Sequence, residues 1–469
     1  MKPIYLINIC FFSTCAIIFG QTVSHNRDTR PIEIAEKIIK TISPDSLKSY
    51  DNTLADFGTR HTMSDTVSLT RGIGVARRWI KSKFESFAQH DADFKVYEDR
   101  FELDSVPRIS RPTTLVNVYG ILQGKEGING RYVVISGHYD SRCTDGMDDT
   151  SDAPGADDDG SGSSLVIEAA RVFTSMHFKP DANIIFICFD GEEQGLYGSA
   201  HFADEAKKKN MDVIADLNND IVGAVKGGNG TIDRNTVRVF SESYGEITIG
   251  KRKIGAGLIG YEDDSPSREL ARYIQTEAKK FTPKFKVDLI YRQDRFLRGG
   301  DQESFNKNGY AAVRFTEPNE DYNHQHQDVR VGTDTVNGKL VRVQYGDLPK
   351  FVDTVYLSNV CKTNSLVAAL LSISPQSPQR AEMLVDKLEY GTRLKWDNAS
   401  QEKGVAGWKI YYRKTWEPFW SGDIMVHPSI DSTVEYNLKT LSKDEYIFGL
   451  SSVGTNGVES VPEAPLPGK

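Results

Sequence analysis

Acidic and histidine side chains form short motifs at the ends of predicted strands, the edge at which an open α/β sheet presents its loops to a ligand. The first motif follows the apolar run 132–136 and contains His138 and Asp140. A histidine alone in such a place is more often structural than functional. Because a metal-bound imidazole commonly donates its other ring N–H to a carboxylate, the nearby Asp140 favours a metal ligand at His138.

Three consecutive carboxylates, Asp157, Asp158 and Asp159, directly precede a predicted helix. An acidic residue there could cap the helix and interact favourably with its dipole. A cap needs only one such residue, however, and three adjacent carboxylates repel one another. A bound cation would offset that repulsion, so the motif indicates a cation site.

A pair of glutamates, Glu192 and Glu193, follows the apolar run 184–189. Adjacent side chains at the end of a strand can point in different directions, so one carboxylate can bind metal while the other transfers protons. By itself the pair is weak evidence, and the same holds for Asp220 after the run 213–217. Their common position at strand ends is what predicts a single site.

The chain around these motifs has the pattern of an α/β domain. Short β-rich apolar runs alternate with helical periodicity, which predicts a three-layer α/β sandwich around a mixed, mostly parallel sheet. Residues 32–86 are mostly helical in pattern, and the glycine-rich interval 222–260 is expected to leave the core. The predicted strands are 115–122, 132–136, 184–189, 213–217, 285–291 and 311–315, and the predicted helices are 163–176, 196–209, 269–280 and 349–373.

After a Pro/Ser/Gln linker the helical period disappears. Short strands separated by turn residues then predict a small all-β sandwich. This part resembles the fibronectin type III module in Trp396, in the aromatic-rich run 407–412 and in Tyr446, which follows Leu441 as in a tyrosine corner.

The charge balance is mildly acidic, with 57 Lys and Arg against 65 Asp and Glu and a formal net charge of −8. Since no basic block is present in the sequence, nucleic-acid binding is not expected. Beyond the first twenty residues the cysteines are Cys143, Cys188 and Cys361, widely spaced and without a Cys-x-x-Cys motif. Stability is therefore expected to come from packing rather than from a disulfide framework.

The motifs between 113 and 373 resemble, in type and order, those of the co-catalytic zinc aminopeptidases of the leucyl aminopeptidase and aminopeptidase Y type. Gly-Ala-Asp-Asp-Asp-Gly-Ser-Gly at 155–162 and Gly-Glu-Glu-Gln-Gly-Leu-Tyr-Gly-Ser at 191–199 carry the likeness. The resemblance implies two zinc ions per chain, bridged by Asp158, and a cis peptide bond between Asp158 and Asp159. The implied metal ligands are His138, Asp158, Glu193, Asp220 and His324.

The last ligand has an alternative. The family pattern Tyr-His-Thr-x-x-Asp is replaced here by Tyr-Asn-His-Gln-His-Gln-Asp at 322–328. Counting back four residues from Asp328 selects His324, and His326 stays open as the other choice. Supporting roles around the ligands are implied for Asp140 and Asp328.

The N-terminus has the layout of a secretory signal peptide, with Lys2 followed by the apolar stretch 4–19. That stretch is shorter than the ~20 residues that cross a bilayer, and no later segment is comparably apolar. We therefore expect an exported protein, periplasmic or secreted, without a membrane span; a lipid anchor through Cys15 is the competing interpretation. The expected organisation is a signal peptide at 1–20, the N-terminal helical part of the catalytic domain at 21–112, the zinc peptidase core at 113–373, the linker at 374–380 and the β-sandwich at 381–469.

The implied activity is that of an exported metallo-aminopeptidase acting on peptides with a free N-terminus. A hydroxide shared by the zinc ions would attack the scissile carbonyl, with Glu192 as general base and Asp140 supporting the catalytic site. One alternative is a glutaminyl cyclase, an acyltransferase that works with one zinc ion on the same fold, although that family breaks the Asp-Asp-Gly stretch intact at 158–160. The other is a non-catalytic binding protein, which would not require the full set of ligands together with Glu192. Side-chain preference, oligomeric state and the role of the sandwich are not predicted.

Overall fold

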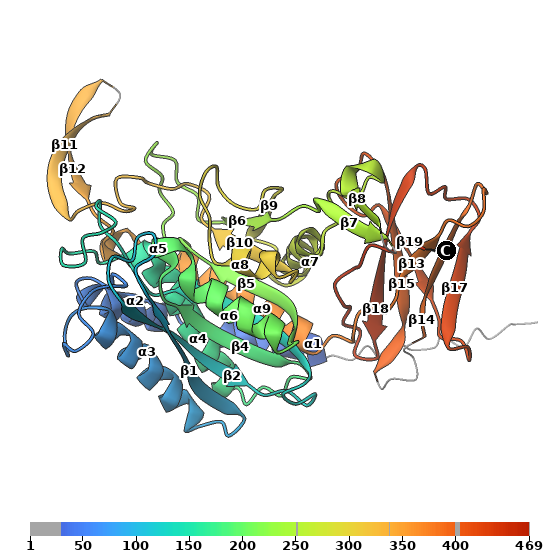
Figure 1. Ribbon diagram of the computed structural model, residues 1–469, viewed down its shortest axis with the longest axis horizontal. Coiled ribbons are helices and arrows are strands. Elements are labelled where there is room, and N and C mark those ends of the chain that lie inside the picture. The colour runs from blue at the N-terminus through green and yellow to red at the C-terminus, as the bar shows by residue number, and fades with distance from the viewer. Residues whose placement is uncertain (1–29, 250–251, 337, 399–403, 469) are drawn as a thin grey trace, which may run out of the picture.

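The structure, a computed structural model, describes residues 30–249, 252–336, 338–398 and 404–468 (Figure 1). The predicted signal peptide and Cys15 lie outside the described residues. Within the described ranges, no helix combines the length and the apolar character needed to cross a membrane. Cys143, Cys188 and Cys361 are all buried and free, so none of the three forms a disulfide.

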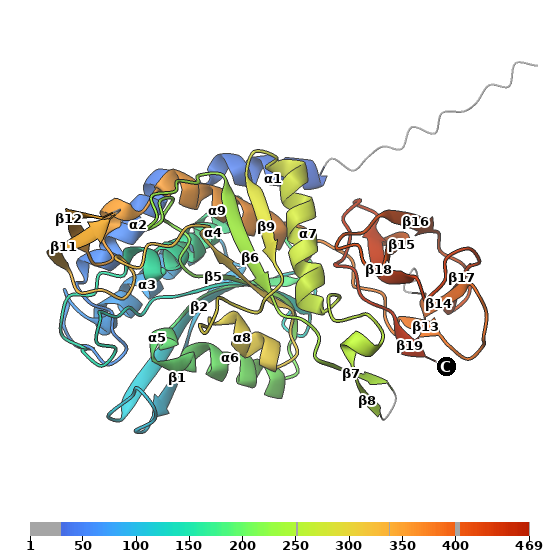
Figure 2. The ribbon, with the colours of Figure 1, turned by 90° about the horizontal axis from the view of Figure 1, so that it is seen from above.

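A mixed eight-stranded sheet forms the centre of the molecule, in the order β1-β2-β4-β3-β5-β10-β6-β9 (Figures 1 and 2). The pairs β4–β3, β3–β5, β5–β10 and β6–β9 are parallel. The pairs β1–β2, β2–β4 and β10–β6 are antiparallel. The strands are β1 (Phe94–Leu103), β2 (Thr113–Leu122), β3 (Arg131–His138), β4 (Asn183–Phe189), β5 (Asp212–Asn219), β6 (Thr236–Ser241), β9 (Lys286–Ile290) and β10 (Ala312–Thr316).

Two strands of this sheet differ from the sequence-based expectation. The interval 222–260 was expected to leave the core, but β6 lies inside the sheet between β10 and β9. The strand is only six residues long and is buried at every position except half-buried Arg238, and the glycine-rich segments around it hide so short a run. The N-terminal part was expected to be helical, yet β1 forms the sheet edge opposite β9, with charged residues at many of its less buried positions.

Helices cover both faces of the sheet, which confirms the predicted three-layer α/β sandwich (Figure 2). One face packs against α1 (Arg30–Thr41), α2 (Pro44–Asp56), α3 (Ile73–Ala88), α4 (Gly162–Ser175), α7 (Pro266–Phe281) and α9 (Thr354–Ser372). The other face carries α5 (Glu192–Gly195), α6 (Tyr197–Lys208) and α8 (Gln302–Lys307). The described residues also form short helical turns: the π-turn η1 (Ala156–Ser161) and the 3-10 turns η2 (Ala256–Leu258) and η3 (Pro349–Phe351).

Local sequence signals set several helix starts. Ser43 and Ser265 each precede a proline, and their hydroxyls accept the N–H groups of Ser46 and Arg268. A serine cap followed by proline satisfies a free N–H group and provides the backbone angle of the first helical residue. These caps place α2 and α7 where the amphipathic pattern begins.

The C-terminal part is a two-sheet sandwich, as predicted. One sheet is formed by β13 (Glu382–Leu384), β14 (Thr392–Asp397), β17 (Thr433–Leu438) and β19 (Leu466–Gly468), and the other by β15 (Val405–Lys414), β16 (Gly422–Val426) and β18 (Tyr446–Gly454). Trp396 and Trp408 are fully buried between the sheets, with ring centroids 5.8 Å apart in an edge-to-face arrangement. The fibronectin type III resemblance stays a prediction.

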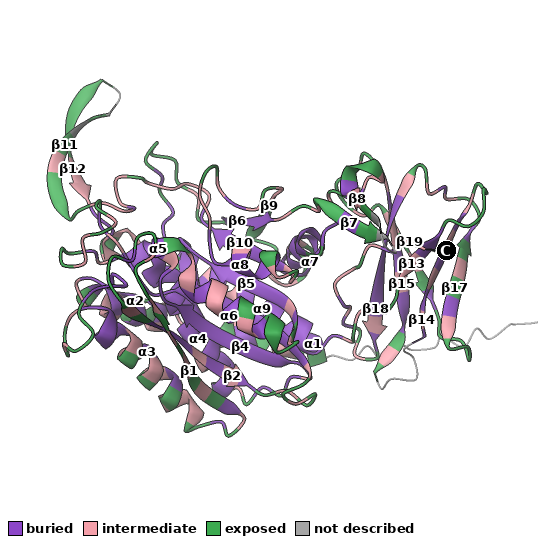
Figure 3. Ribbon diagram, viewed as in Figure 1, coloured by how far each residue is buried: buried purple, intermediate pink, exposed green. Residues whose placement is uncertain are grey.

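Two hairpins extend from the α/β domain. The hairpin β7 (Glu246–Ile249)–β8 (Arg252–Gly255) packs toward the sandwich, where Ile247 and Tyr261 share a buried cluster with Ile447. The hairpin β11 (Arg330–Val336)–β12 (Lys339–Tyr345) projects away from the body and is largely exposed, in contrast to the buried strands β3 and β4 (Figure 3).

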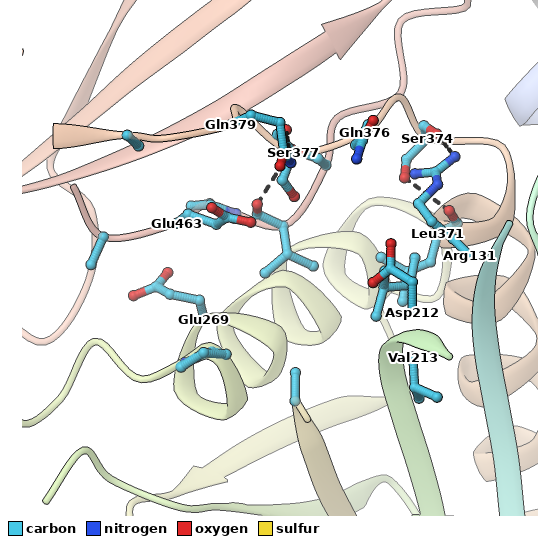
Figure 4. A pocket seen from close by; sticks show the side chains of 18 of the residues that line it. Arg131, Asp212, Val213, Glu269, Leu371, Ser374, Gln376, Ser377, Gln379 and Glu463 are labelled. Carbon is cyan, nitrogen blue, oxygen red and sulfur yellow. Dashed lines mark hydrogen bonds between the residues drawn. The ribbon is translucent and has the colours of Figure 1, made fainter. Parts of the chain in front are cut away.

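A buried ion pair and a hydrogen bond join the sandwich to α7 and the segment before it. Arg413 donates to both carboxylate oxygens of Asp264 at 2.8 and 2.6 Å, and the Trp420 ring N–H donates to Glu269 at 3.1 Å. Beside these contacts, a cavity of about 420 Å³ lies between the two parts, with Arg131 donating to the carbonyl of Ser374 at its edge (Figure 4). The candidate metal ligands do not line this cavity.

Candidate metal centre

Three predicted ligands converge where β3 and β5 end. His138 is the last residue of β3, Asp220 directly follows β5, and Asp158 lies in η1. The Nε2 atom of His138 is 3.4 Å from Asp158 Oδ1 and 3.8 Å from Asp220 Oδ1. All three side chains are buried, and their ligand atoms lie within 4.8 Å of one another.

A second group shares Asp158 with the first. The Nε2 atom of His326 lies 2.9 Å from Asp158 Oδ2 and 3.0 Å from Glu193 Oε1. These three ligand atoms also lie within 4.8 Å of one another. The two carboxylate oxygens of Asp158 thus face different groups, which is the geometry of a ligand that bridges two cations.

The atoms that face the two groups are buried and incompletely paired. Among the described residues, His138 Nε2 makes no hydrogen bond. Asp158 Oδ2 and Glu193 Oε1 share the single Nε2 atom of His326, and Asp220 Oδ1 lies 2.8 Å from Arg314 Nη2. Buried polar atoms in folded proteins are almost always paired, so the buried His138 nitrogen among these carboxylates calls for a missing partner. Imidazole nitrogens and carboxylate oxygens are ligands that zinc accepts, and the residues present therefore fit a pair of metal ions.

The electrostatics of the centre agree with this fit. Burial alone would lower the pKa of His326, but the carboxylates of Glu193 and Asp158 raise it to about 10. Burial also acts to lower the pKa of His138, and Glu192 with its neighbouring carboxylates raises it well above the ordinary value. The site therefore attracts positive charge, which a metal ion can supply in place of these protons.

His326, and not His324, completes the second group, which corrects the choice made from spacing. The ring of His324 stacks on Phe351 with centroids 3.5 Å apart, and its Nδ1 atom is 3.7 Å from Asp321. A turn in which His324 N–H donates to the Asp321 carbonyl at 2.9 Å holds it there. His326 follows with a left-handed φ of 51°, which redirects its side chain toward Asp158.

Asp328 is bound to a neighbouring loop. Its backbone N–H donates to the Thr144 hydroxyl at 3.0 Å, and its carboxylate accepts the Thr144 N–H at 3.2 Å. This reciprocal pair fixes the loop that follows His138 to the segment that carries His326. The structure thus shows Asp328 in a loop contact, and a supporting role toward the ligands stays a prediction.

Only the middle carboxylate of the Asp157–Asp159 motif faces the metal groups. Asp157 accepts the N–H of Gly223 at 2.7 Å, and Asp159 accepts the N–H of His138 at 3.0 Å. The peptide bond between Asp158 and Asp159 is cis, as the resemblance implied. Repulsion among three carboxylates around one cation therefore does not describe this motif, because two of the carboxylates are held by backbone N–H groups.

Asp347 fixes the backbone of this motif, and sequence reasoning missed it. Its carboxylate accepts the N–H of Asp157 at 2.9 and 3.0 Å and the N–H of Asp158 at 2.7 Å. Asp347 is buried and lies just after β12. A lone aspartate in the sequence gives no signal for this contact.

Asp140 orients the neighbouring motifs. Its carboxylate accepts the N–H of Glu192 at 3.1 Å and that of Glu193 at 3.1 Å, and also the Thr62 hydroxyl at 3.2 Å. Oδ1 lies 3.4 Å from His138 Nδ1, the ring nitrogen that faces away from the first group. Asp140 therefore holds the imidazole and the glutamate pair in fixed relation, and its supporting role stays a prediction.

Glu192 stands beside the metal groups without belonging to either. Its Oε2 atom is 3.8 Å from His138 Nε2, and its side chain is 12% exposed. Burial raises the pKa of Glu192, His138 opposes this rise, and Asp220, Glu193 and Asp301 add to it. A carboxylate at the edge of such a centre, left out of both ligand groups, is placed to accept a proton and release it again.

Comparison with known proteins gives a consistent result. Residues 117–335 match the model of Peptidase family M28, a range that includes every residue of both groups. The chain is 39% identical over 442 residues to a probable zinc metalloprotease of Leptosphaeria maculans, covering 93% of this chain and 98% of that protein. It is 41% identical over 434 residues to a probable zinc metalloprotease of Pyricularia oryzae, covering 91% and 83%.

The fold is shared with a solved structure. The LapA aminopeptidase of Legionella pneumophila superimposes with a TM-score of 0.52 at 21% identity, covering 74% of this chain and 76% of that one. At this identity the likeness concerns the fold alone.

Proposed function

Because this chain belongs to Peptidase family M28, we propose that it is an exported zinc aminopeptidase that removes N-terminal residues from peptides. The observation that carries the proposal is the pair of ligand groups joined by Asp158, in each of which the ligand atoms lie within 4.8 Å of one another. The zinc assignment is supported by the two relatives, each of which is named a probable zinc metalloprotease.

The residues of the first group, His138, Asp158 and Asp220, would hold one zinc ion, and Asp158, Glu193 and His326 would hold the other. When bound, the ions would polarise the scissile carbonyl and make the attacking water more acidic.

Glu192 is the proposed general base. It would accept a proton from the attacking water and return it to the departing amine. Its support is its position 3.8 Å from His138 and the burial that raises its pKa. Asp140 would act as a positioning residue, since it holds the Glu192 backbone and faces the His138 ring.

The aminopeptidase assignment is narrower than the family and rests on the two sequence signatures at 155–162 and 191–199. Export rests on Lys2 and the apolar stretch 4–19. N-terminal sequencing of protein recovered from outside the producing cell tests export, with a new N-terminus near Gln21 expected and retention inside the cell contradicting it.

A substrate panel tests the activity. Aminoacyl fluorogenic compounds and short peptides would be compared with the same peptides acetylated at the N-terminus. The proposal expects release of free N-terminal residues from unblocked substrates only, loss of this activity with a chelator, and recovery on adding zinc. Cleavage of acetylated peptides at internal bonds would contradict the aminopeptidase assignment. Conversion of N-terminal glutamine to a ring with release of ammonia would instead indicate the cyclase alternative.

A further inference from the structure

A buried arginine contacts one of the candidate metal ligands. Arg314 lies in β10 and is fully buried. Its Nη2 atom is 2.8 Å from Asp220 Oδ1 and donates to the Asp220 carbonyl at 3.4 Å. Its Nη1 atom donates to both carboxylate oxygens of Asp294 at 3.1 Å. One guanidinium thus joins two carboxylates from different segments.

The sheet register explains the contact. In the parallel pair β5–β10, Arg314 lies opposite Asn218. Side chains alternate along a strand, so Arg314 shares a face with Asn218 and with Asp220 two positions later. The pairing continues past the strand end, because Asp220 N–H donates to the Phe315 carbonyl at 3.2 Å. A long side chain at 314 therefore reaches the edge of the sheet at which β5 ends and the candidate ligands lie.

The position is costly for a charge. Arg314 lies in a central strand among Ala312, Val313 and Phe315, all fully buried. Removing a charge from water is expensive unless it is paired and hydrogen-bonded, and a neutral side chain would fill this strand at lower cost. Since the guanidinium is held by Asp220, Asp294 and the Gly299 carbonyl, the last at 2.8 Å, the charge serves a contact and not only packing.

Asp294 makes the arrangement rigid on the side away from the metal groups. Its Oδ2 atom accepts a hydrogen bond from the side-chain amide of Gln302 at 2.7 Å, and Asp294 as a whole is 5% exposed. Burial acts to raise the pKa of Asp294. The positive charges of Arg314 and Arg295 outweigh that effect and lower the pKa to about 2. The loop from Arg292 to Asp301 is therefore connected through Arg314 to Asp220.

The connection reaches only one of the two ligand groups. Asp220 belongs to the group with His138 and Asp158. Across the described residues, no hydrogen bond or ion pair joins Arg314 to Glu193 or His326. The two groups thus differ in their dependence on this arginine.

We propose that Arg314 is a positioning residue that fixes the Asp220 carboxylate, so that the metal ion at His138, Asp158 and Asp220 depends on it and the ion at Asp158, Glu193 and His326 does not. This inference rests on the proposed two-ion function. It adds to that function an asymmetry between the two ions.

The test uses paired substitutions, because Arg314→Met alone would remove one of the two cations beside buried Asp294 and leave only Arg295. The double variant R314M/D294N removes both charges and keeps similar volumes. D294N alone keeps the contact between Arg314 and Asp220. A matched control is R413M/D264N, which removes a buried Arg–Asp pair of the same kind at the sandwich interface.

The readouts are zinc affinity, measured by equilibrium competition with a chelator, and the visible spectrum of the cobalt-substituted protein. The wild-type protein, D294N and the R413M/D264N control are expected to bind two ions. R314M/D294N is expected to bind one ion with wild-type affinity and the other about 10–100-fold more weakly, the usual effect of losing a group that supports a metal ligand. In R314M/D294N, the spectrum after one equivalent of cobalt should match that of the wild-type protein. The spectral change that a second equivalent causes in the wild-type protein should be lost.

Equal binding of both ions by R314M/D294N and the wild-type protein would overturn the inference and leave the proposed function intact. Equal weakening of both ions would overturn it as well, because it denies the asymmetry. A wild-type protein that binds fewer than two ions contradicts the proposed function itself. If the double variant does not fold, R314K decides, since a lysine keeps the charge but lacks the fork that reaches both carboxylates; selective weakening of one ion is again required.

Discussion

The Nε2 atom of His326 lies 2.9 Å from Oδ2 of Asp158, although the two residues come from distant parts of the chain. This contact places a histidine against the second oxygen of a carboxylate whose first oxygen faces His138 at 3.4 Å. It turns two separate ligand groups into one centre. His324, two residues earlier, packs instead on Phe351.

The two histidines should therefore respond differently to substitution. His326→Ala is expected to lose one of two zinc ions and most peptidase activity, because it removes the only imidazole of the second group. His324→Ala should keep both ions and lose only a modest stacking contact. Zinc content after dialysis, measured beside turnover of an aminoacyl substrate, distinguishes them. Loss of zinc in His324→Ala with retention in His326→Ala would reverse the assignment.

Removal of the proposed base should separate chemistry from metal binding. Glu192→Gln keeps the shape of the side chain and removes its ability to accept a proton, so kcat is expected to fall by about 10²–10⁴-fold with both ions retained. Asp158→Ala, in contrast, should lose metal as well as activity, because both groups share this carboxylate. Metal analysis and kcat are measured on the same preparations. Wild-type turnover in Glu192→Gln would show that another group takes the proton.

Asp190 should make folding stability depend on pH. It is fully buried, and burial, with the charge of Asp140, raises its pKa to about 7. A folded pKa above the unfolded value of 3.8 gives a stability contribution that is present below about pH 4 and is lost as the pH rises through about 7. Asp190→Asn keeps an oxygen to accept the N–H of Val116 and the hydroxyl of Tyr139.

The variant is therefore expected to be more stable than the wild-type protein at pH 8, by on the order of 2–4 kcal/mol, and to lose this advantage at low pH. Urea unfolding at pH 5 and pH 8, at one fixed zinc concentration, measures the difference. The same free-energy difference at both pH values would mean that Asp190 is already ionised in the folded protein.

The sandwich should be an integral part of the fold. Arg413→Met removes the two hydrogen bonds to buried Asp264 and leaves only the Arg272 guanidinium, 3.6 Å away, which is expected to cost about 1.5–3 kcal/mol of unfolding free energy. Arg413→Met combined with Asp264→Asn should recover part of that loss, because no unpaired charge remains. Thermal and urea unfolding of the two variants check the order. Unchanged stability of Arg413→Met would indicate that the interface contributes little.

The sequence predicted the central strands well because β3 and β4 are continuous apolar runs that end in turn-forming or polar residues. It failed for β6, a six-residue strand surrounded by glycine-rich segments, and for β1, whose charged residues lie along an edge strand. In both cases the position in the sheet is determined by pairing with strands that are remote in sequence.

The structure brings together the candidate ligands on β3, η1, α5 and the end of β5, each of which belongs to a short motif with a characteristic order. The histidine of the second group was not predictable, because spacing to Asp328 does not reveal the turn that places His324 on Phe351 and His326 on Asp158. Asp347 and Arg314 had no signal at all. Each acts through one contact to a distant segment, and single residues of these types are common.

Diffraction data collected at the zinc absorption edge would show whether two zinc ions bind at the groups that share Asp158. We expect two anomalous peaks, both in contact with Asp158. One should lie among His138, Asp158 and Asp220 and the other among Asp158, Glu193 and His326. No peak at these residues in zinc-loaded crystals, or a peak coordinated by His324, would contradict it.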